Sequence, residues 1–167
     1  LDQCGDGIRA MLIDGENTVV TDPDRKHCEH ALKSLDHLVV IDIFMTDTAA
    51  LADVVLPSSS WGETDGSCSN TERRVQRLRA AVKPAGESKP DWWIVSQIAQ
   101  RLGISGFDYD SAKDVFNELC DVSPVYAGLD WDLIDKGEYQ WPVPEKGHPG
   151  TPILHQDEFL NGRGIFS

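Results

Sequence analysis

A short stretch rich in polar residues, GETDGSCSNTERR at positions 62–74, has the composition of a ligand-binding loop. Gly66 permits backbone angles that other residues rarely adopt, and Asn70 and Arg73 supply side-chain donors. The planar guanidinium of arginine suits phosphates and other anions. We therefore predict a loop that holds an anionic ligand. The alternative is that Glu72 and the arginines pair among themselves and simply order the loop.

The turn Gly15-Glu16-Asn17 is a second candidate, because it joins an apolar run to a predicted helix. In open α/β sheets, ligands bind in the crevice at the carboxyl ends of the strands. A glycine in such a turn lets the backbone come close to a ligand, and the free N–H groups of the following helix attract an anion. A plain strand-to-helix turn is the alternative.

Asp42 is a third candidate, since it ends a second apolar run 27 residues after Gly15. In dinucleotide-binding folds, an acid at the end of the second strand accepts hydrogen bonds from a ribose. Thr46 follows four residues later and is expected to bind the same ligand from the next helix cap. The alternative is that Asp42 caps its own turn and Thr46 caps the helix.

The remaining reactive side chains have less specific interpretations. His27, Cys28 and His30 share helical spacing on an acidic helix, which indicates a solvated face rather than a metal site. The four cysteines include no CxxC pair, so we predict free thiols in a reducing compartment and a cytoplasmic location. We predict no catalytic residue and no metal ligand within the chain.

The elements that position these candidates follow from runs of apolar residues and from capping residues. Strands are predicted over 8–14, 38–42 and 53–56, helices over 21–34 and from 46, and a further strand over 75–82. After a linker over 83–90, helices are predicted over 90–102 and from 111. Ile94, Ile98 and Leu102 are expected on one face of the first of these helices, and Gly103 is expected to end it. In the second helix, Val115, Phe116 and Leu119 are expected to point inward. The alternation predicts an α/β fold: a Rossmann-like open, mostly parallel sheet with flanking helices, plus an extended Pro/Gly-rich C-terminal segment.

The charge of the chain excludes several classes of partner. Its 167 residues carry a formal net charge of −13, which repels phosphate backbones and anionic lipid, so we expect no nucleic-acid partner. No apolar run approaches the roughly 18 residues of a membrane helix, so we expect no membrane segment. The chain begins at Leu1 and ends at Ser167 after a Gly- and Pro-rich stretch, and we expect a piece of a longer polypeptide.

The motifs together resemble one family. IRAMLIDGEN, LVVIDIFMTDTAALADVVLP, SSSWGETDG, SNTERRVQR and KPDWWIVSQIAQRLG occur in this order between Ile8 and Gly103. They resemble the catalytic subunits of the molybdopterin oxidoreductases, over about 95 residues. The resemblance implies a partial Rossmann-like domain over 1–104 that binds one guanosine arm of a bis-molybdopterin guanine dinucleotide. It further implies a helical extension over 105–141 and a linker over 142–167 toward a missing C-terminal domain.

The resemblance also implies roles for individual residues. Gly15, Glu16 and Asn17 match the first cofactor turn of the family, and Asp42 and Thr46 match the residues that hold the guanosine end. The segment with Gly66, Asn70 and Arg73 matches one packed near the cofactor. The family's N-terminal cysteine motif and the Cys or selenocysteine ligand of molybdenum or tungsten are absent. A 4Fe-4S cluster is therefore expected elsewhere in the parent, and this fragment alone is expected to be inactive.

Within the family, four short motifs are most similar to those of a formate dehydrogenase catalytic (alpha) subunit: SWGE at 60–63, QWP at 140–142, GTP at 150–152 and FLNG at 159–162. Such a subunit oxidises formate to CO2 by two electrons. The expected partners are the remaining domains of the polypeptide and electron-transfer subunits or carriers. Two alternatives stay open: an assimilatory nitrate reductase, and a non-catalytic scaffold as in the large iron–sulfur subunit of respiratory NADH dehydrogenase.

Overall fold

The computed structural model describes residues 1–159 and 162–164, and their contacts group into two compact units. Unit 1 comprises Leu1–Thr64 and Arg79–Tyr109, and unit 2 comprises Asp65–Leu78 and the chain from Asp110 onward. The domain boundaries expected at 104 and 141 concern the parent polypeptide and stay predictions. Of the motif FLNG, Leu160 and Asn161 lie outside the described residues.

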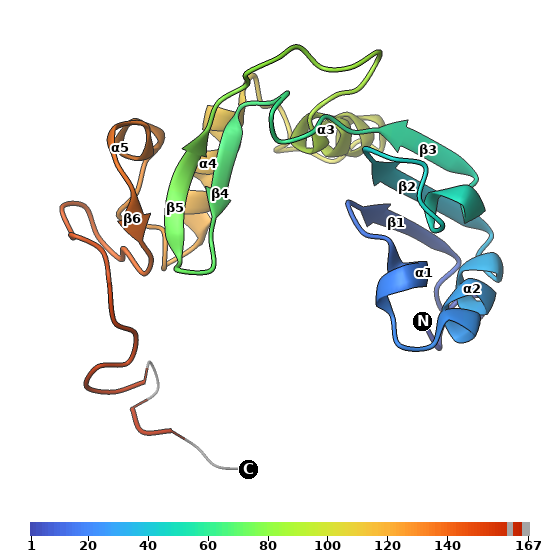
Figure 1. Ribbon diagram of the computed structural model, residues 1–167, viewed down its shortest axis with the longest axis horizontal. Helices are drawn as coiled ribbons and strands as arrows, with labels where there is room; N and C mark the ends of the chain where they lie inside the picture. Colours follow the sequence, from blue (N-terminus) through green and yellow to red (C-terminus); the bar gives the residue numbers. More distant parts are fainter. Residues whose placement is uncertain (160–161, 165–167) are drawn as a thin grey trace. The chain divides into compact units, whose positions relative to one another are not determined.

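Unit 1 is built on a parallel sheet of three strands in the order β1-β2-β3 (Figure 1). The strands are β1 (Ala10–Asp14), β2 (His37–Asp42) and β3 (Val54–Pro57). The three predicted apolar runs are thus confirmed as strands, with small shifts at their ends. The register pairs Asp14 with Ile41 and Asp42 with Pro57, so the carboxyl ends of all three strands lie at one edge.

Helices follow the strands as the α/β pattern predicts. They are α1 (Thr18–Thr21), α2 (Arg25–Lys33), the 3-10 turn η1 (Ala49–Leu51) and α3 (Asp91–Arg101). The helix predicted over 21–34 is confirmed as α2, whose first turn is capped by the Asp24 side chain accepting from the His27 N–H. The separate turn α1 was not predicted. It ends before Asp22, which precedes a proline and is extended, with ψ 144°.

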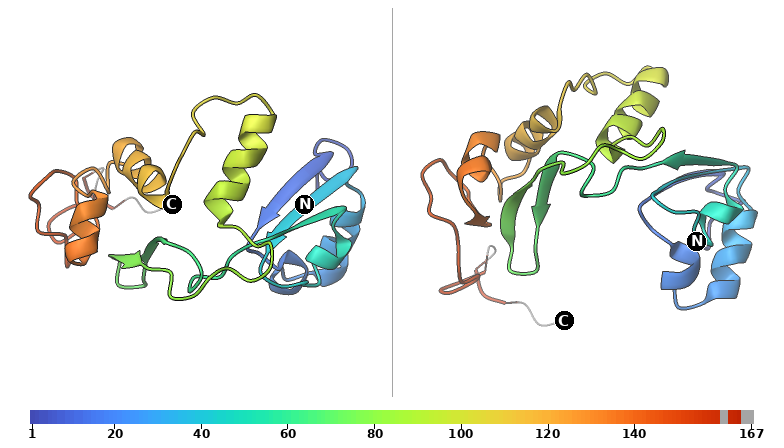
Figure 2. Two further views of the ribbon diagram at one scale, coloured as in Figure 1. Left: turned by 90° about the horizontal axis from the view of Figure 1, so that it is seen from above. Right: turned by 45° about the horizontal axis from the view of Figure 1, so that its top comes forward.

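The core of unit 1 lies between the sheet and α1, α2 and η1. Its buried members are Ile13, Val19, Cys28, Leu32, Leu38, Val40 and Ala49. Figures 1 and 2 show α1 and α2 on the same side of the sheet and α3 toward the other side. Ile94 of α3 is buried, whereas Leu102, which was expected on the same face of the helix, is 71% exposed. Leu102 follows the last residue of α3, where the chain turns at Gly103 with φ 75°.

Unit 2 contains an antiparallel sheet in the order β4-β5-β6 with two helices. Its strands are β4 (Gly66–Ser69), β5 (Arg74–Leu78) and β6 (Tyr139–Gln140), and its helices are α4 (Ala112–Val122) and α5 (Trp131–Lys136). The core consists of Val75, Phe116, Cys120, Leu129, Ile134 and Val143. The stretch 62–74, predicted as a loop, therefore contributes a strand and the tight turn of a hairpin. The strand predicted over 75–82 is confirmed as the shorter β5.

Helix α4, predicted to start at Ser111, begins with a capping box in which Ser111 and Asp114 exchange side-chain and backbone hydrogen bonds. Phe116 is 3% exposed, as expected for an inward residue. Leu119 is 39% exposed, so its predicted inward orientation is wrong. Cys120 is buried in its place, because a residue four positions after Phe116 lies on the same face of a helix.

Beyond Gln140, the described residues form no helix or strand, but part of this segment is packed. Val143 is 1% exposed and exchanges backbone hydrogen bonds with Val125 and Gly128. A Cβ atom on Gly128 would collide with the carbonyl of Glu145, so this close approach needs glycine. The linker role expected for 142–167 stays a prediction. Across residues 1–159 and 162–164, no helix has both the length and the apolarity to cross a membrane.

Candidate cofactor-binding site

The turn after β1 brings open backbone to the carboxyl edge of the unit 1 sheet. Gly15 donates its N–H to the carbonyl of Ile41 at 2.9 Å and has φ 64°, a conformation that favours glycine. A Cβ atom built on Gly15 would meet nothing within 4 Å, so the space beside this turn is open. Helix α1 has only four residues, so its dipole is small. The helix therefore adds little to the attraction of an anion that was predicted for this turn.

Asn17 joins this turn to the loop that follows β2. Its Oδ1 accepts from the Thr48 N–H at 3.2 Å and from the Thr48 hydroxyl at 2.9 Å. The same hydroxyl accepts from the Val19 N–H at 3.0 Å, and Thr48 is fully buried. Glu16, the middle residue of the turn, accepts from the Thr21 hydroxyl. Thr48 was missed by the sequence analysis, because its burial and its long-range partner leave no local signal.

Asp42 and Thr46 shape the loop that they flank. Asp42 Oδ1 accepts from the Phe44 N–H at 3.0 Å, and Thr46 Oγ1 accepts from the Ala49 N–H at 3.1 Å. The capping alternatives are therefore confirmed for both residues. A ligand role is compatible with them, because a carboxylate has a second oxygen and the threonine hydroxyl can still donate. The predicted contact of Asp42 and Thr46 with a guanosine stays a prediction.

The loop between these two residues is apolar and exposed. Phe44 and Met45 are 71% and 72% exposed, and Ile43 is 49% exposed. Three adjacent apolar side chains at a strand end, next to open backbone, form a surface suited to a ring or to another part of the protein.

Asp14 adds a negative charge to the same edge. Its pKa is raised, chiefly by partial desolvation and then by the negative charges of Asp91 and Asp42. Asp91 begins α3 and accepts a hydrogen bond from the Ser58 hydroxyl, just after β3. Three carboxylates thus gather where the strands end. Sequence analysis did not select Asp14, although its place as the last residue of β1 was visible.

The other three predicted site residues belong to unit 2, where they build the β4–β5 hairpin. Gly66 begins β4 opposite Leu78. Asn70 accepts from the Arg74 N–H through its side chain at 3.0 Å and from the Arg73 N–H through its carbonyl at 2.9 Å. Arg73 has φ 66°, which is rare for a residue other than glycine.

The guanidinium of Arg73 is engaged by the protein itself. It donates to the carbonyl of Trp141 and, at 2.9 Å, to that of Pro152, and it lies 5.6 Å from the centre of the Trp141 ring. Arg74 pairs with Glu72 at 2.8 Å, so the alternative of pairing within the stretch is confirmed for Arg74, whereas Arg73 donates to backbone carbonyls outside it. The contacts of Arg73 support a segment of unit 2, and its predicted cofactor contact stays untested.

The histidine and cysteine cluster on α2 does not converge on one point. His27 Nε2 lies 3.0 Å from Asp2, whereas Cys28 is fully buried in the core. The pKa of the Cys28 thiol is raised, chiefly by desolvation. Cys28 therefore behaves as a small apolar side chain, and all four cysteines are free thiols.

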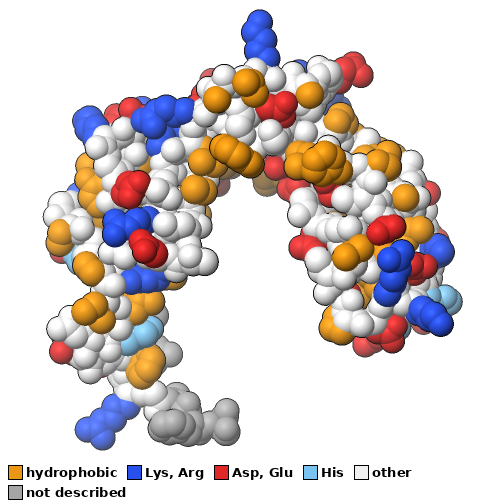
Figure 3. All heavy atoms as spheres, viewed as in Figure 1, with side chains coloured by type: hydrophobic (Ala, Val, Ile, Leu, Met, Phe, Trp, Pro, Cys, Tyr) orange, Lys and Arg blue, Asp and Glu red, His pale blue; other side chains and the backbone are white. Residues whose placement is uncertain are grey.

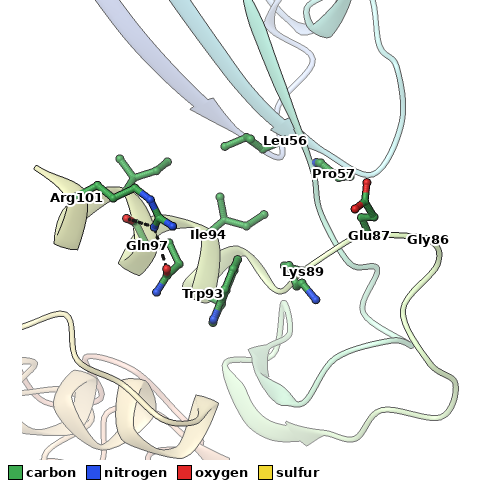
Figure 4. A pocket seen from close by; sticks show the side chains of 10 residues that line it. Leu56, Pro57, Gly86, Glu87, Lys89, Trp93, Ile94, Gln97 and Arg101 are labelled. Atoms are coloured by element: carbon green, nitrogen blue, oxygen red, sulfur yellow. Dashed lines mark hydrogen bonds between the residues drawn. The ribbon is translucent and has the colours of Figure 1, made fainter.

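A separate pocket of about 610 Å³ lies in unit 1 between the end of β3 and α3 (Figure 4). Its lining is largely apolar, with Leu56, Pro57, Trp93 and Ile94 among its members. None of the eight predicted site residues lines it, so this pocket is distinct from the turn and loop described above. Figure 3 shows acidic and basic side chains interspersed on the visible face, as expected for a solvated surface.

The chain matches known proteins along its whole length. A model of the molybdopterin oxidoreductase family matches residues 3–101. The F420-dependent formate dehydrogenase subunit alpha of Methanocaldococcus jannaschii is 50% identical over 98% of this chain and 25% of its own length. The F420-dependent formate dehydrogenase 2 subunit alpha of Methanococcus maripaludis is 46% identical over 100% of this chain and 25% of its own.

A solved structure agrees with the sequence relatives. Acetylene hydratase from Pelobacter acetylenicus aligns with a TM-score of 0.65 and 25% identity, over 85% of this chain and 20% of that chain. The chain spans about a quarter of the length of the curated relatives that it matches. The family match, the relatives and the parallel sheet with its polar carboxyl edge agree: the chain belongs to the molybdopterin oxidoreductase family.

Proposed function

We propose that this chain is the part of a formate dehydrogenase alpha subunit that holds a guanosine end of a molybdopterin guanine dinucleotide. The observation that carries the proposal is 50% identity to a formate dehydrogenase subunit alpha, spread over 98% of the chain. The aligned length covers both units of the chain, including the segments that hold the candidate residues. The parent subunit then oxidises formate to CO2.

The residues at the sheet edge fit such a group. A nucleotide with a diphosphate needs backbone that it can approach closely, and Gly15 offers an open side with positive φ. A ribose or a base edge needs fixed acceptors, and Asp42 is held in place by the Phe44 N–H. When bound, the bis-pterin centre with its molybdenum or tungsten supplies the two-electron chemistry. A 4Fe-4S cluster belongs to another part of the parent.

Each residue of the edge has a distinct task in this proposal. Gly15 and Glu16 present the turn, and Asn17 fixes it through Thr48. Asp42 offers its second carboxylate oxygen as an acceptor, and Thr46 offers its hydroxyl proton as a donor. The chain orients the dinucleotide, while the reactive metal lies at the pterin end.

The hairpin residues take a supporting part. Gly66, Asn70 and Arg73 form the segment assigned to the neighbourhood of the cofactor. Since the guanidinium of Arg73 already binds two carbonyls, it acts by holding the segment from Trp141 to Pro152 in shape. The catalytic metal ligand is assigned to the rest of the parent, and we expect the 167 residues alone to be inactive.

The partners follow from the same relatives. The parent subunit works with further subunits or carriers that accept its electrons, in the cytoplasm. Two of the relatives are named F420-dependent, so F420 is the acceptor to test first.

The test uses the full-length parent, purified and analysed for molybdenum, tungsten and acid-released guanine nucleotide. Formate-dependent and nitrate-dependent dye reduction are measured on the same preparation, with F420 as a further acceptor. Metal, nucleotide and formate activity together support the proposal. Metal together with nitrate activity would mean that the substrate is nitrate, while the proposed cofactor site stays the same. Iron without molybdenum, tungsten or nucleotide would mean that the fold serves as a scaffold.

A further inference from the structure

Thr48 occupies a position that none of the candidate residues shares. It is fully buried, and it makes three hydrogen bonds with two partners across 29 and 31 residues of sequence. Its backbone N–H and its hydroxyl both donate to Asn17 Oδ1, while the hydroxyl oxygen accepts from the Val19 N–H. The turn after β1 and the loop after β2 therefore meet at this one side chain.

Asp42, Thr46 and Glu16 make local hydrogen bonds, and Asp47 pairs with Arg25 of α2 at 3.5 Å. Asp42 bonds to Phe44 two residues on, Thr46 to Ala49 three residues on, and Glu16 to Thr21 five residues on. These contacts give each loop its own shape, but they do not set the spacing between the loops. At the strand ends, the Gly15 N–H to Ile41 carbonyl bond fixes only the start of the turn.

We propose that Thr48 is a positioning residue for the dinucleotide: its hydroxyl and N–H hold the Gly15–Asn17 turn and the Asp42–Thr46 loop at the spacing that a bound nucleotide requires. This inference rests on the proposed function. A ligand that spans two loops binds tightly only if the spacing of the loops is fixed before it arrives, because otherwise the entropy lost in ordering the loops weakens binding.

Threonine is the residue that this position needs. Its hydroxyl donates to one partner and accepts from another, which a valine of the same shape cannot do. Valine would leave Asn17 Oδ1 one donor short and the buried Val19 N–H without its acceptor. Serine keeps the hydroxyl and loses only a methyl group.

The experiment compares Thr48→Val and Thr48→Ser in the full-length parent. The readouts are molybdenum or tungsten per polypeptide, guanine nucleotide released by acid, and the rate at which both are lost during dilution. We expect Thr48→Val to lose cofactor about tenfold faster, as one broken buried hydrogen-bond pair implies, with the KM for formate unchanged in the loaded fraction. Thr48→Ser should restore retention to near the wild-type rate.

Ser96→Ala is the matched control, because Ser96 is 3% exposed and its hydroxyl bonds to the Trp92 carbonyl within α3. It should lose stability but keep its cofactor. Equal loss from Ser96→Ala and Thr48→Val would assign the effect to general destabilisation and overturn the proposal, as would wild-type retention in Thr48→Val. A wild-type parent without nucleotide would instead overturn the proposed function itself.

Asn17→Ala tests the same contact from its other side, on a residue that is only half-buried, in case Thr48→Val does not fold. We expect it to lose cofactor as fast as Thr48→Val, and the double variant to lose it no faster than either single variant. Full retention in Asn17→Ala, or additive losses in the double variant, would contradict a shared role.

Discussion

At the scale of single residues, Asp42 combines an observed contact within its own loop with the role that we propose for it in binding the nucleotide. One oxygen accepts from the Phe44 N–H, and the other makes no hydrogen bond to the described part of the chain. Asp42→Ala should lower the metal and nucleotide content of the purified parent several-fold, because it removes both the loop contact and the acceptor. Asp42→Asn keeps the loop contact through its amide oxygen, so the metal and nucleotide content should fall less in this variant.

Asp53→Ala is the control for this pair. Asp53 accepts from the Leu38 N–H at 2.7 Å, at the amino end of β2, so the substitution removes a similar bond at the opposite edge of the sheet. It should cost about 1 kcal/mol of stability and leave metal and nucleotide content unchanged. Cofactor loss from Asp53→Ala equal to that from Asp42→Ala would mean that sheet stability, rather than the polar edge, controls retention.

Asp14 gives a prediction with a defined pH dependence. Its folded pKa lies above the ordinary value of 3.8, so folding favours its protonated form. The ionised carboxylate therefore destabilises the fold once the pH rises through that pKa, and the effect is absent below the unfolded pKa. Asp14→Asn should raise the stability of the chain at pH 7 by up to about 0.5 kcal/mol and change little near pH 3. Equal gains at both pH values in thermal unfolding would contradict this cause.

At the scale of elements, Arg73 in the turn of the β4–β5 hairpin connects this hairpin to the segment from Trp141 to Pro152. The guanidinium of Arg73 bonds to two carbonyls of the irregular segment that contains the buried Val143. Arg73→Lys keeps the charge and the strained backbone, but an ammonium group lacks the planar guanidinium that donates to both carbonyls. We therefore expect the free energy of unfolding to fall by about 1–2 kcal/mol. Hydrogen exchange at the Val143 and Thr151 amides should become faster, since these amides belong to the released segment.

Arg74→Lys is the matched control, because Arg74 lies next in sequence and its ion pair with Glu72 is exposed. Exposed ion pairs contribute about 0–1 kcal/mol, so this variant should exchange at nearly the wild-type rate. Faster exchange at Val143 in Arg74→Lys than in Arg73→Lys would show that charge on the hairpin, rather than the two carbonyl contacts, holds the segment.

The elements of unit 1 could be predicted because their signals are local. The apolar runs that end at Asp14 and Asp42 and the capping residue Asp24 each specify structure within a few positions, as Ser111 does for α4 in unit 2. The hairpin was missed because its strand β4, GSCS, has no apolar alternation and obtains its pairing from β5. Its small, polar residues are typical of a loop, and only the partner strand makes them a strand.

The residues of the candidate site also divide into those with a local signal in the sequence and those without one. Gly15 and Asp42 could be found because a strand end marks their place in the sequence. Thr48 could not, because its partner Asn17 lies 31 residues away and only the folded sheet brings the two together. For Arg73, the sequence shows a suitable donor but not the carbonyls that already occupy it.

At the scale of the whole molecule, the two units each have a core of their own, and both lie within a strongly acidic chain. Two cores of this size predict a cooperative thermal transition for the 167 residues expressed alone. The formal charge of −13 acts against that fold through repulsion among its many carboxylates. The balance between core packing and repulsion therefore depends on how far salt screens the charges.

Screening shortens the range of repulsion from about 10 Å at 0.1 M salt to about 3 Å at 1 M. We expect the melting temperature of the chain at pH 7 to rise by about 2–4 °C over this interval in sodium chloride, equivalent to about 1 kcal/mol. The control is the same titration near pH 4.6, the isoelectric point, where the net repulsion vanishes and the shift should be much smaller. A melting temperature that falls with salt at pH 7 would show that attractive pairs, such as Arg77 with Asp135, outweigh the repulsion. The stability of the fold would then depend on specific ion pairs, and neutralising the acidic surface residues would lower that stability rather than raise it.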